Sequence, residues 1–257
     1  SAAAGSVEFE GKAELAKHAA EGVATIRLDE AGMLAPLARA GVKGGFVTTL
    51  GFSAAKELLR ATAVLQSSEL HVEPRLQLGN TLIHVDLTGP SWWSELPGAY
   101  EIASNGNARV QVDEFFDDEV TYALKTTLSP SSELRVDALT VTDENVRVGA
   151  RGTLDLKAGT AKAGIELTVA ELAGLAPVSE RGLGGTLALT ADVTASRDIQ
   201  SAEVTVDLAN LSGLPAAVRE AFGKSLRGTT AIEKTGDEVA WRRTNVQAGP
   251  LSLQGEG

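Results

Sequence analysis

Apolar and polar residues alternate along most of the chain with a period of two. In residues 186–195, TLALTADVTA, the side chains of Leu187, Leu189 and Val193 fall on one side of an extended strand, and three threonines and an aspartate fall on the other. Successive side chains of a strand point to opposite faces of a sheet, so this pattern predicts a strand with one half-buried face. The same alternation predicts strands within residues 7–15, 81–87, 146–156, 163–172 and 202–209.

The apolar positions of these strands predict an apolar face, and the Thr, Asp and Glu residues between them predict a polar face in contact with water. Phe46 and Phe52 join the apolar set because an internal repeat aligns them with Leu187 and Val193 at the same parity. We expect the apolar face to be lined by Phe46, Phe52, Val146, Val148, Leu154, Leu156, Ile165, Leu167, Val169, Leu187, Leu189, Val193, Val204, Val206 and Leu208.

Helical patterns are few and short. Residues 29–41, 170–182 and 214–225 each hold enough apolar residues at helical spacing for two or three turns, and each ends near a glycine. Gly, Asn, Asp and Ser gather between the alternating runs, as turns require. The sequence therefore predicts an all-β chain with a few short helices.

The chain contains an internal repeat. LAPLARAG at residues 34–41 returns as LAPVSERG at 175–182, and the offset that places Leu34 on Leu175 gives nine identities in 37 aligned pairs without a gap. The final LSLQGEG resembles VRVGARG, with Gly255 in the place of Gly152. Self-similarity of this kind indicates an array whose units bury their apolar faces against their neighbours. We interpret residues 1–257 as one segment of a longer repeat protein, with units at about 11–151 and 152–254, a third beginning at 255, and an insertion within 71–130.

Composition narrows the possible functions. The net charge of −11 disfavours nucleic acid as a partner, because phosphate binding requires a clustered positive surface. The chain has no cysteine, which excludes disulfides, thiolate nucleophiles and cysteine metal sites. The sequence contains no run of 18 or more apolar residues, so it predicts no membrane-spanning helix. Aromatic residues make up only 4%, so an apolar interior must be built mainly from aliphatic side chains.

Candidate catalytic and metal-binding groups are scattered. His84 and Asp86 share one face of a predicted strand, but a zinc site requires further ligands. No G-x-S-x-G element is present, and RGLGG at 181–185 lacks the lysine and the strand-to-helix context of a phosphate loop. We therefore expect neither an enzyme, nor a metal site, nor a cofactor.

Two further motifs leave alternatives open. DEFFDDEV at residues 113–120 lacks the spacing of a calcium loop, and a solvated loop or an acidic rim is favoured over a calcium site. Trp92 and Trp93 are expected to cap the end of the core under a short helix. The other interpretation places the tryptophan pair at the edge of the apolar face or at a membrane interface.

Several of these elements together resemble the repeat region of the TamB family, in the wider AsmA-like group. They are the segment ELTVAELAGLAPVSERGLGGTLALTADV, the strand SAEVTVDLANL after it and LTVTDENVRVGARGTLDL before it. The recurring order is a strand, a short Leu-Ala-Pro helix, a glycine pair and a series of alternating strands. The resemblance is clearest over residues 133–257, fair over 6–70 and weak over 71–130.

This resemblance implies an elongated, mostly antiparallel sheet curled into an open apolar trough, often called a β-taco. It also implies a parent protein that is anchored in the inner membrane of a Gram-negative bacterium and extends through the periplasm. Members of the family are associated with phospholipid transport towards the outer membrane and with autotransporter assembly. The implied partners are phospholipid acyl chains and, through a C-terminal region outside this segment, a TamA-like outer-membrane barrel.

Two other interpretations remain at this stage. A structural or adhesive β-solenoid, such as a passenger domain, would fill its interior with the same aliphatic residues. An enzyme on a β-helix would need carboxylates or a histidine clustered on one exposed face. The first usually has shorter repeats with ladders of Asn, Ser or Gly, and strand parity does not supply the cluster that the second requires.

Overall fold

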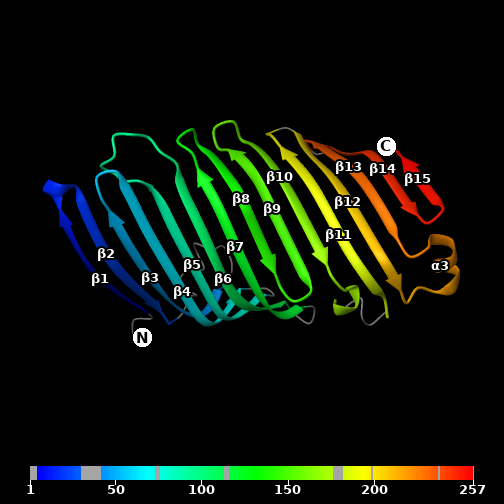
Figure 1. Cartoon of the computed structure of the whole chain (residues 1–257), viewed down its shortest axis with the longest axis horizontal. Coiled ribbons are helices and arrows are strands. Elements are labelled where there is room, and N and C mark those ends of the chain that lie inside the picture. Colours follow the sequence, from blue (N-terminus) through cyan, green and yellow to red (C-terminus); the bar gives the residue numbers. More distant parts are fainter. Residues whose placement is uncertain are drawn as a thin grey trace. The chain divides into compact units, whose positions relative to one another are not determined.

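The computed structural model describes residues 5–29, 42–72, 76–112, 116–175, 182–197, 199–236 and 238–256. The chain forms two compact units, residues 1–131 and 132–257. Both are built almost entirely from long strands, so the prediction of an all-β chain is confirmed (Figure 1).

In the first unit each strand pairs antiparallel with the next strand along the chain. The strand order is therefore the sequence order, and a short 3-10 turn, η1 (Leu15–Lys17), joins the first two strands. The strands are β1 (Gly5–Glu14), β2 (Ala19–Leu28), β3 (Val42–Ala54), β4 (Leu58–Val72), β5 (Leu76–Pro90), β6 (Tyr100–Val112) and β7 (Phe116–Leu128).

The second unit has the same architecture, again with antiparallel neighbours in sequence order. Its strands are β8 (Glu133–Thr142), β9 (Val146–Asp155), β10 (Thr160–Val169), β11 (Gly184–Ala195), β12 (Ile199–Ser212), β13 (Leu226–Thr235), β14 (Glu238–Ala248) and β15 (Leu251–Gly255). Short helical elements lie between strands: η3 (Leu172–Gly174) and α3 (Ala216–Phe222).

Each unit is an open antiparallel sheet, as predicted, and only the predicted curl into a trough is wrong. Strand order follows sequence order from one edge to the other, and no pairing among the described residues joins the first strand of a unit to its last. Strands that pair with their neighbours in sequence order build an open sheet, and this pairing does not itself require the sheet to curl. Hydrophobic alternation specifies which face a side chain takes, but it does not specify curvature.

The strand pairings recur at the offset of the sequence repeat. The ten pairs that join β1 to β2, from Gly5 with Leu28 onward, reappear as the ten pairs of β9 and β10, from Val146 with Val169 onward. The nine pairs of β2 with β3 reappear in the same way in β10 with β11. Corresponding residues therefore occupy the same face and the same height in both units. The predicted unit boundaries, at about 11–151 and 152–254, stay a prediction.

Of the three predicted helical segments, one contains an α-helix and one contains a short 3-10 helix. The segment 214–225 contains α3, which ends at Gly223 with a positive φ of 73°, as the glycine signal predicts. The described part of the segment 170–182 contains the three-residue η3, and residues 176–181 lie outside the described residues. The segment 29–41, which contains the first Leu-Ala-Pro, also lies outside them except for Asp29.

Candidate functional site

The apolar positions of the second unit form rows that run across neighbouring strands. Because directly paired residues of an antiparallel sheet point to the same face, the register decides which side chains meet. Val146 is paired with Val169, Val169 with Leu187, and Leu187 with Leu208. The next row continues the face through Val148, Leu167, Leu189 and Val206, and further rows contain Leu154, Ile165, Val193 and Val204.

The register of this face is set locally by two aspartate turns. Between β8 and β9 the Asp143 carboxylate accepts the backbone N–H of Asn145 at 2.7 Å. Between β9 and β10 the Asp155 carboxylate accepts the N–H groups of Lys157 and Ala158, each at 2.8 Å. These hydrogen bonds lower the pKa of Asp155. Short turns of this kind fix which residues are opposite in the hairpin, and thereby fix the face.

Because the turn begins after Asp155, strand β9 is one residue shorter than predicted and does not include Leu156. Leu156 follows the last residue of β9, and its N–H donates to the carbonyl oxygen of Ser132 at 3.0 Å. Its side chain is 55% exposed. The strand therefore ends one residue before Leu156, which lies in the turn.

The first unit has a corresponding face. Phe46 is paired with Leu28, and Phe52 is paired with Gly22 on one side and with Ala61 on the other. All three partners are uncharged, and the small ones leave room for the phenyl ring. A Cβ atom built on Gly22 would lie 2.7 Å from the Phe52 ring, so glycine is needed at this close approach.

Charge separates the two faces of each sheet. The paired rows that contain the predicted face residues of β9 to β12 hold no Asp, Glu, Lys or Arg. The ion pairs lie among the alternate side chains, as with Lys12 and Glu21 at 3.0 Å. Glu21 raises the pKa of Lys12 through their hydrogen bond, and Arg242 lowers the pKa of Glu233 at 2.8 Å. These pairs are exposed to solvent and stabilise the sheet little.

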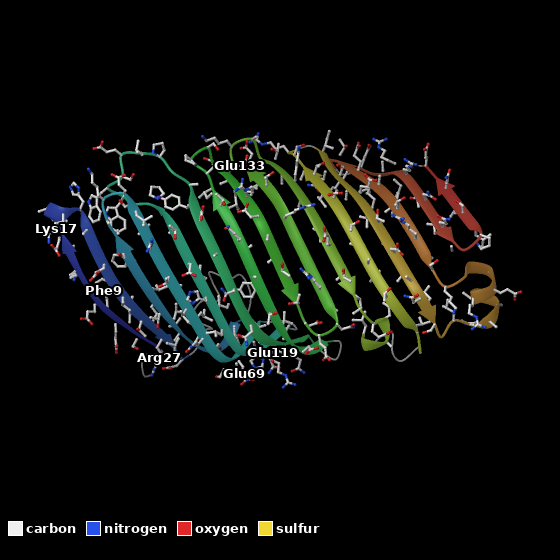
Figure 2. All side chains as sticks on the ribbon, in the orientation of Figure 1. Phe9, Lys17, Arg27, Glu69, Glu119 and Glu133 are labelled. Atoms are coloured by element: carbon white, nitrogen blue, oxygen red, sulfur yellow. The ribbon has the colours of Figure 1, made fainter. Side chains whose placement is uncertain are left out.

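Among the residues that the structure describes, no second layer covers the apolar face. The chain exposes 16698 Å², whereas a compact monomer of 26.6 kDa exposes about 11,000 Å². Figure 2 shows the side chains standing on the ribbon of the strands. Along β11 the apolar residues are half-buried and the alternate residues exposed, which is the burial that lateral neighbours alone provide. Among the described residues the buried hydrophobic side chains are Ala54, Val169, Leu172 and Ala248.

An aromatic group lies at one end of the face in the first unit. Trp92, in the connection between β5 and β6, has its ring centroid 6.4 Å from that of Phe52 and 5.0 Å from that of Trp93. Trp93 stacks on His18 at 6.0 Å. Trp92 is 58% exposed, and residues 91–99 contain no helix. The expected cap under a short helix is therefore wrong, and the pair lies at the edge of the apolar face.

Hydrogen bonds hold this connection in place. The Ser91 hydroxyl donates to the Lys56 carbonyl oxygen at 2.7 Å and accepts the N–H of Trp93 at 3.2 Å. The Ser94 hydroxyl donates to the Glu57 carboxylate at 3.2 Å. The tryptophans are thus anchored on the turn that joins β3 and β4, far earlier in the chain. The local sequence pattern around the tryptophans does not predict their contact with the turn between β3 and β4.

The predicted list of face residues omits the edge strands, although the alternation over residues 7–15 predicts a strand there. Val7 and Phe9 on β1 are 70% and 67% exposed, and Leu253 on β15 is 68% exposed. Val7 is paired with Ile26 and Phe9 with Ala24, so both belong to the apolar rows (Figure 2 labels Phe9). In the sequence VEFE, residues 7–10, Val7 and Phe9 alternate with glutamates, and this alternation could have assigned both residues to the apolar face.

The described residues offer little for chemistry on the opposite, polar faces. The His84 ring is 3.2 Å from the Asp86 carboxylate, as their shared parity predicts. No group of three or more potential metal ligands is found among the described residues, either around His84 and Asp86 or elsewhere. A surface depression of about 610 Å³ over β1 to β4 is lined by Glu10, Lys12, Glu21 and Arg60 among others. Residues 113–115 of the acidic motif lie outside the described residues.

Comparison with known proteins gives no relative: no protein-family model, curated protein or solved structure matches the chain. Among the described residues no helix is long and apolar enough to cross a membrane.

Proposed function

We propose that this chain is a segment of a TamB-like protein of the bacterial periplasm, and that its apolar face carries phospholipid acyl chains towards the outer membrane. The observation that carries the proposal is the set of uncharged rows across β9 to β12, which no other described part of the chain covers. A surface of this kind is rarely left open to water in a monomeric protein unless something binds to it.

Acyl chains suit these rows for a physical reason. They offer no hydrogen-bonding group, so they match a face made of Val, Leu, Ile, Ala and Gly side chains. Each methylene removed from water contributes about 0.8 kcal/mol. Because this gain has no preferred direction, a chain can slide from one row to the next without breaking a specific contact. Transport along the face then requires no catalytic residue.

The open sheet disfavours the other interpretation, a structural or adhesive solenoid. A solenoid of that class fills its interior with its own side chains, whereas Leu189 and its row neighbours, Leu167 and Val206, are only half-buried. The proposal extends to an inner-membrane anchor and to a TamA-like outer-membrane barrel, both outside this segment. They rest on the resemblance of the Leu-Ala-Pro and alternating-strand elements to the TamB family.

Site-specific photocrosslinking in cells tests the proposal in the full-length protein. A photoreactive amino acid at Leu189 lies on the apolar face, and one at Thr190 lies next to it on the opposite face. We expect lipid adducts from position 189 and none from position 190. Adducts at neither position, with position 189 crosslinking only within the protein, would show that the face is a closed structural core in the assembled protein.

A further inference from the structure

The three tryptophans of the chain lie at corresponding ends of the two units. In the first unit this end holds the connections that join β1 to β2, β3 to β4 and β5 to β6, and we call it the hairpin end. Figure 2 labels Lys17 at this end and Arg27 at the opposite end. The corresponding end of the second unit holds the connections from β9 to β10, β11 to β12 and β13 to β14. Trp92 and Trp93 lie in the connection between β5 and β6, and Trp241 lies close to the start of β14.

Large aliphatic side chains are exposed at the same end. Leu96, in the connection between β5 and β6, is 73% exposed. Leu15 and its repeat counterpart Leu156 are both exposed, as are Leu58 and its counterpart Ile199, the first residues of β4 and β12. Leu156 stays exposed although β8 pairs with β9 on its outer side, so the exposure of Leu15 does not depend on β1 being the first strand. Both units thus place aliphatic side chains in water at matching positions.

Backbone N–H groups of the connection between β5 and β6 are hydrogen-bonded within the connection itself. Those of Trp93 and Ser94 donate to the hydroxyl and the carbonyl oxygen of Ser91, at 3.2 and 3.0 Å. That of Leu96 donates to the Ser94 hydroxyl at 3.3 Å, and Pro97 has no N–H to satisfy. A backbone donor that leaves water without a partner costs free energy. These internal hydrogen bonds therefore lower the cost of moving the connection into an apolar medium.

The charges at the hairpin end of the first unit balance. Its three connections, residues 15–18, 55–57 and 91–99, hold two lysines, Lys17 and Lys56, and two glutamates, Glu57 and Glu95. The net charge of −11 that the whole chain carries is therefore not concentrated at this end. A surface with balanced charges and exposed apolar side chains matches a zwitterionic lipid surface, to which it is drawn by burial of apolar area and not by net charge.

We propose that the hairpin end of the first unit inserts into the headgroup region of a zwitterionic lipid bilayer, with Trp92 and Leu96 as its anchors. An indole combines an apolar ring with an N–H donor, and tryptophan accordingly concentrates at membrane–water interfaces. The Trp92 ring centroid also lies 6.4 Å from that of Phe52, which belongs to the apolar face. An acyl chain that leaves the bilayer beside Trp92 can therefore reach the apolar face without crossing water, a consequence that rests on the proposed function.

Sedimentation with phosphatidylcholine vesicles tests this contact on the whole 257-residue chain. We expect Leu96→Ser and Trp92→Ser each to lower the partition coefficient about tenfold, because each removes one large apolar side chain from the bilayer. Leu82→Ser is the matched control, since it makes the same substitution at an exposed leucine of the same unit, which is paired with Gln66 and Asn107 on the polar face. We expect this control, and added salt, to leave the binding unchanged.

Fluorescence quenching locates the contact. In the double variant Trp93→Phe, Trp241→Phe, we expect lipids brominated near the headgroup to quench Trp92 more strongly than lipids brominated at the chain ends. Leu189→Asp separates this contact from acyl-chain transport, because it alters the apolar face and should keep vesicle binding. Absence of vesicle binding, equal losses in Leu96→Ser and Leu82→Ser, or a loss in Leu189→Asp as large as in Leu96→Ser would overturn the proposal. A chain that binds vesicles through Leu96 but binds no fatty acid would support this contact and contradict only the transport of acyl chains.

Discussion

Gly44 and Gly185 occupy corresponding positions of the internal repeat, and both have a positive φ, of 102° and 132°. In each unit the pairing of the surrounding strands shifts by one residue close to this glycine, between Gly45 and Val47 in β3 and between Gly184 and Thr186 in β11. In β11 Gly185 lies inside the irregularity, whereas in β3 Gly44 is paired with Leu70 and the irregularity begins after Gly45. In both units the glycine thus lies within or next to a β-bulge. Only glycine adopts this backbone conformation without strain.

Substituting this glycine should destabilise the second unit. A Cβ atom on Gly185 would lie 2.7 Å from the carbonyl oxygen of Ala209, in addition to the strain of the positive φ. We expect Gly185→Ala to lower the free energy of unfolding by about 2 kcal/mol, measured by urea denaturation. Gly149→Ala is the control, since no positive φ is found there and its nearest Cβ contacts lie at 3.9 Å. An equal loss of stability in both variants would contradict this role of the bulge.

The strands and the membership of the faces could be predicted from the sequence because both depend on local alternation. The row from Val146 through Val169 and Leu187 to Leu208 follows directly from parity once neighbouring strands pair in sequence order. Leu156 was misplaced because the alternation continues one residue past Asp155, whose carboxylate accepts hydrogen bonds that begin the turn. When a short turn interrupts an alternating pattern, the alternation alone does not show where the strand ends.

Features that depend on distant residues could not be predicted. The Trp92 ring reaches Phe52 because Ser91 and Ser94 bond to the turn between β3 and β4, and no local pattern specifies that contact. The open form of the sheet is likewise a property of many strands together. The family resemblance implied a curled trough, whereas the pairing of consecutive strands requires only that each new strand adds to an open edge.

The turn after β9 should be sensitive to acid. The N–H groups of Ala158 and Lys157 hold the pKa of Asp155 below its ordinary value of 3.8, so the carboxylate favours the folded state above that value. This contribution is present at neutral pH and is lost as the pH falls through the lowered folded-state pKa. We expect a carboxyl NMR titration to place the midpoint of Asp155 below 3.8, and we expect amide exchange at Lys157 and Ala158 to quicken only in that acidic range. A midpoint at the ordinary value would show that the turn does not depend on the carboxylate.

A charge on the apolar face should disrupt lipid binding without unfolding the sheet. Leu189 lies between Leu167 and Val206, so Leu189→Asp would place an unpaired carboxylate beneath a bound acyl chain. Desolvating that charge costs more than the ~1.4 kcal/mol of a tenfold change in affinity. We expect at least about a tenfold weaker binding of a fluorescent fatty acid, with the circular dichroism unchanged.

Thr190→Asp is the matched control for this variant, because it introduces the same group one residue away on the polar face. We expect it to bind the fatty acid like the unmodified chain. Equal losses in the two variants would show that the apolar face has no special role in binding.

Trp92 should report directly on lipid at the edge of the face. The chain has three tryptophans, so the double variant Trp93→Phe, Trp241→Phe leaves Trp92 as the only indole. Trp92 is 58% exposed and lies 6.4 Å from Phe52, so a bound acyl chain on that part of the face would contact the indole. We expect a phospholipid with brominated acyl chains to quench its fluorescence, and the unbrominated lipid to leave it bright. A Thr190→Trp residue in a background without other tryptophans should stay unquenched, because it faces the polar side. If both indoles were quenched alike, the lipid would be contacting the sheet without preference for the apolar face, and the conduit proposal would fail.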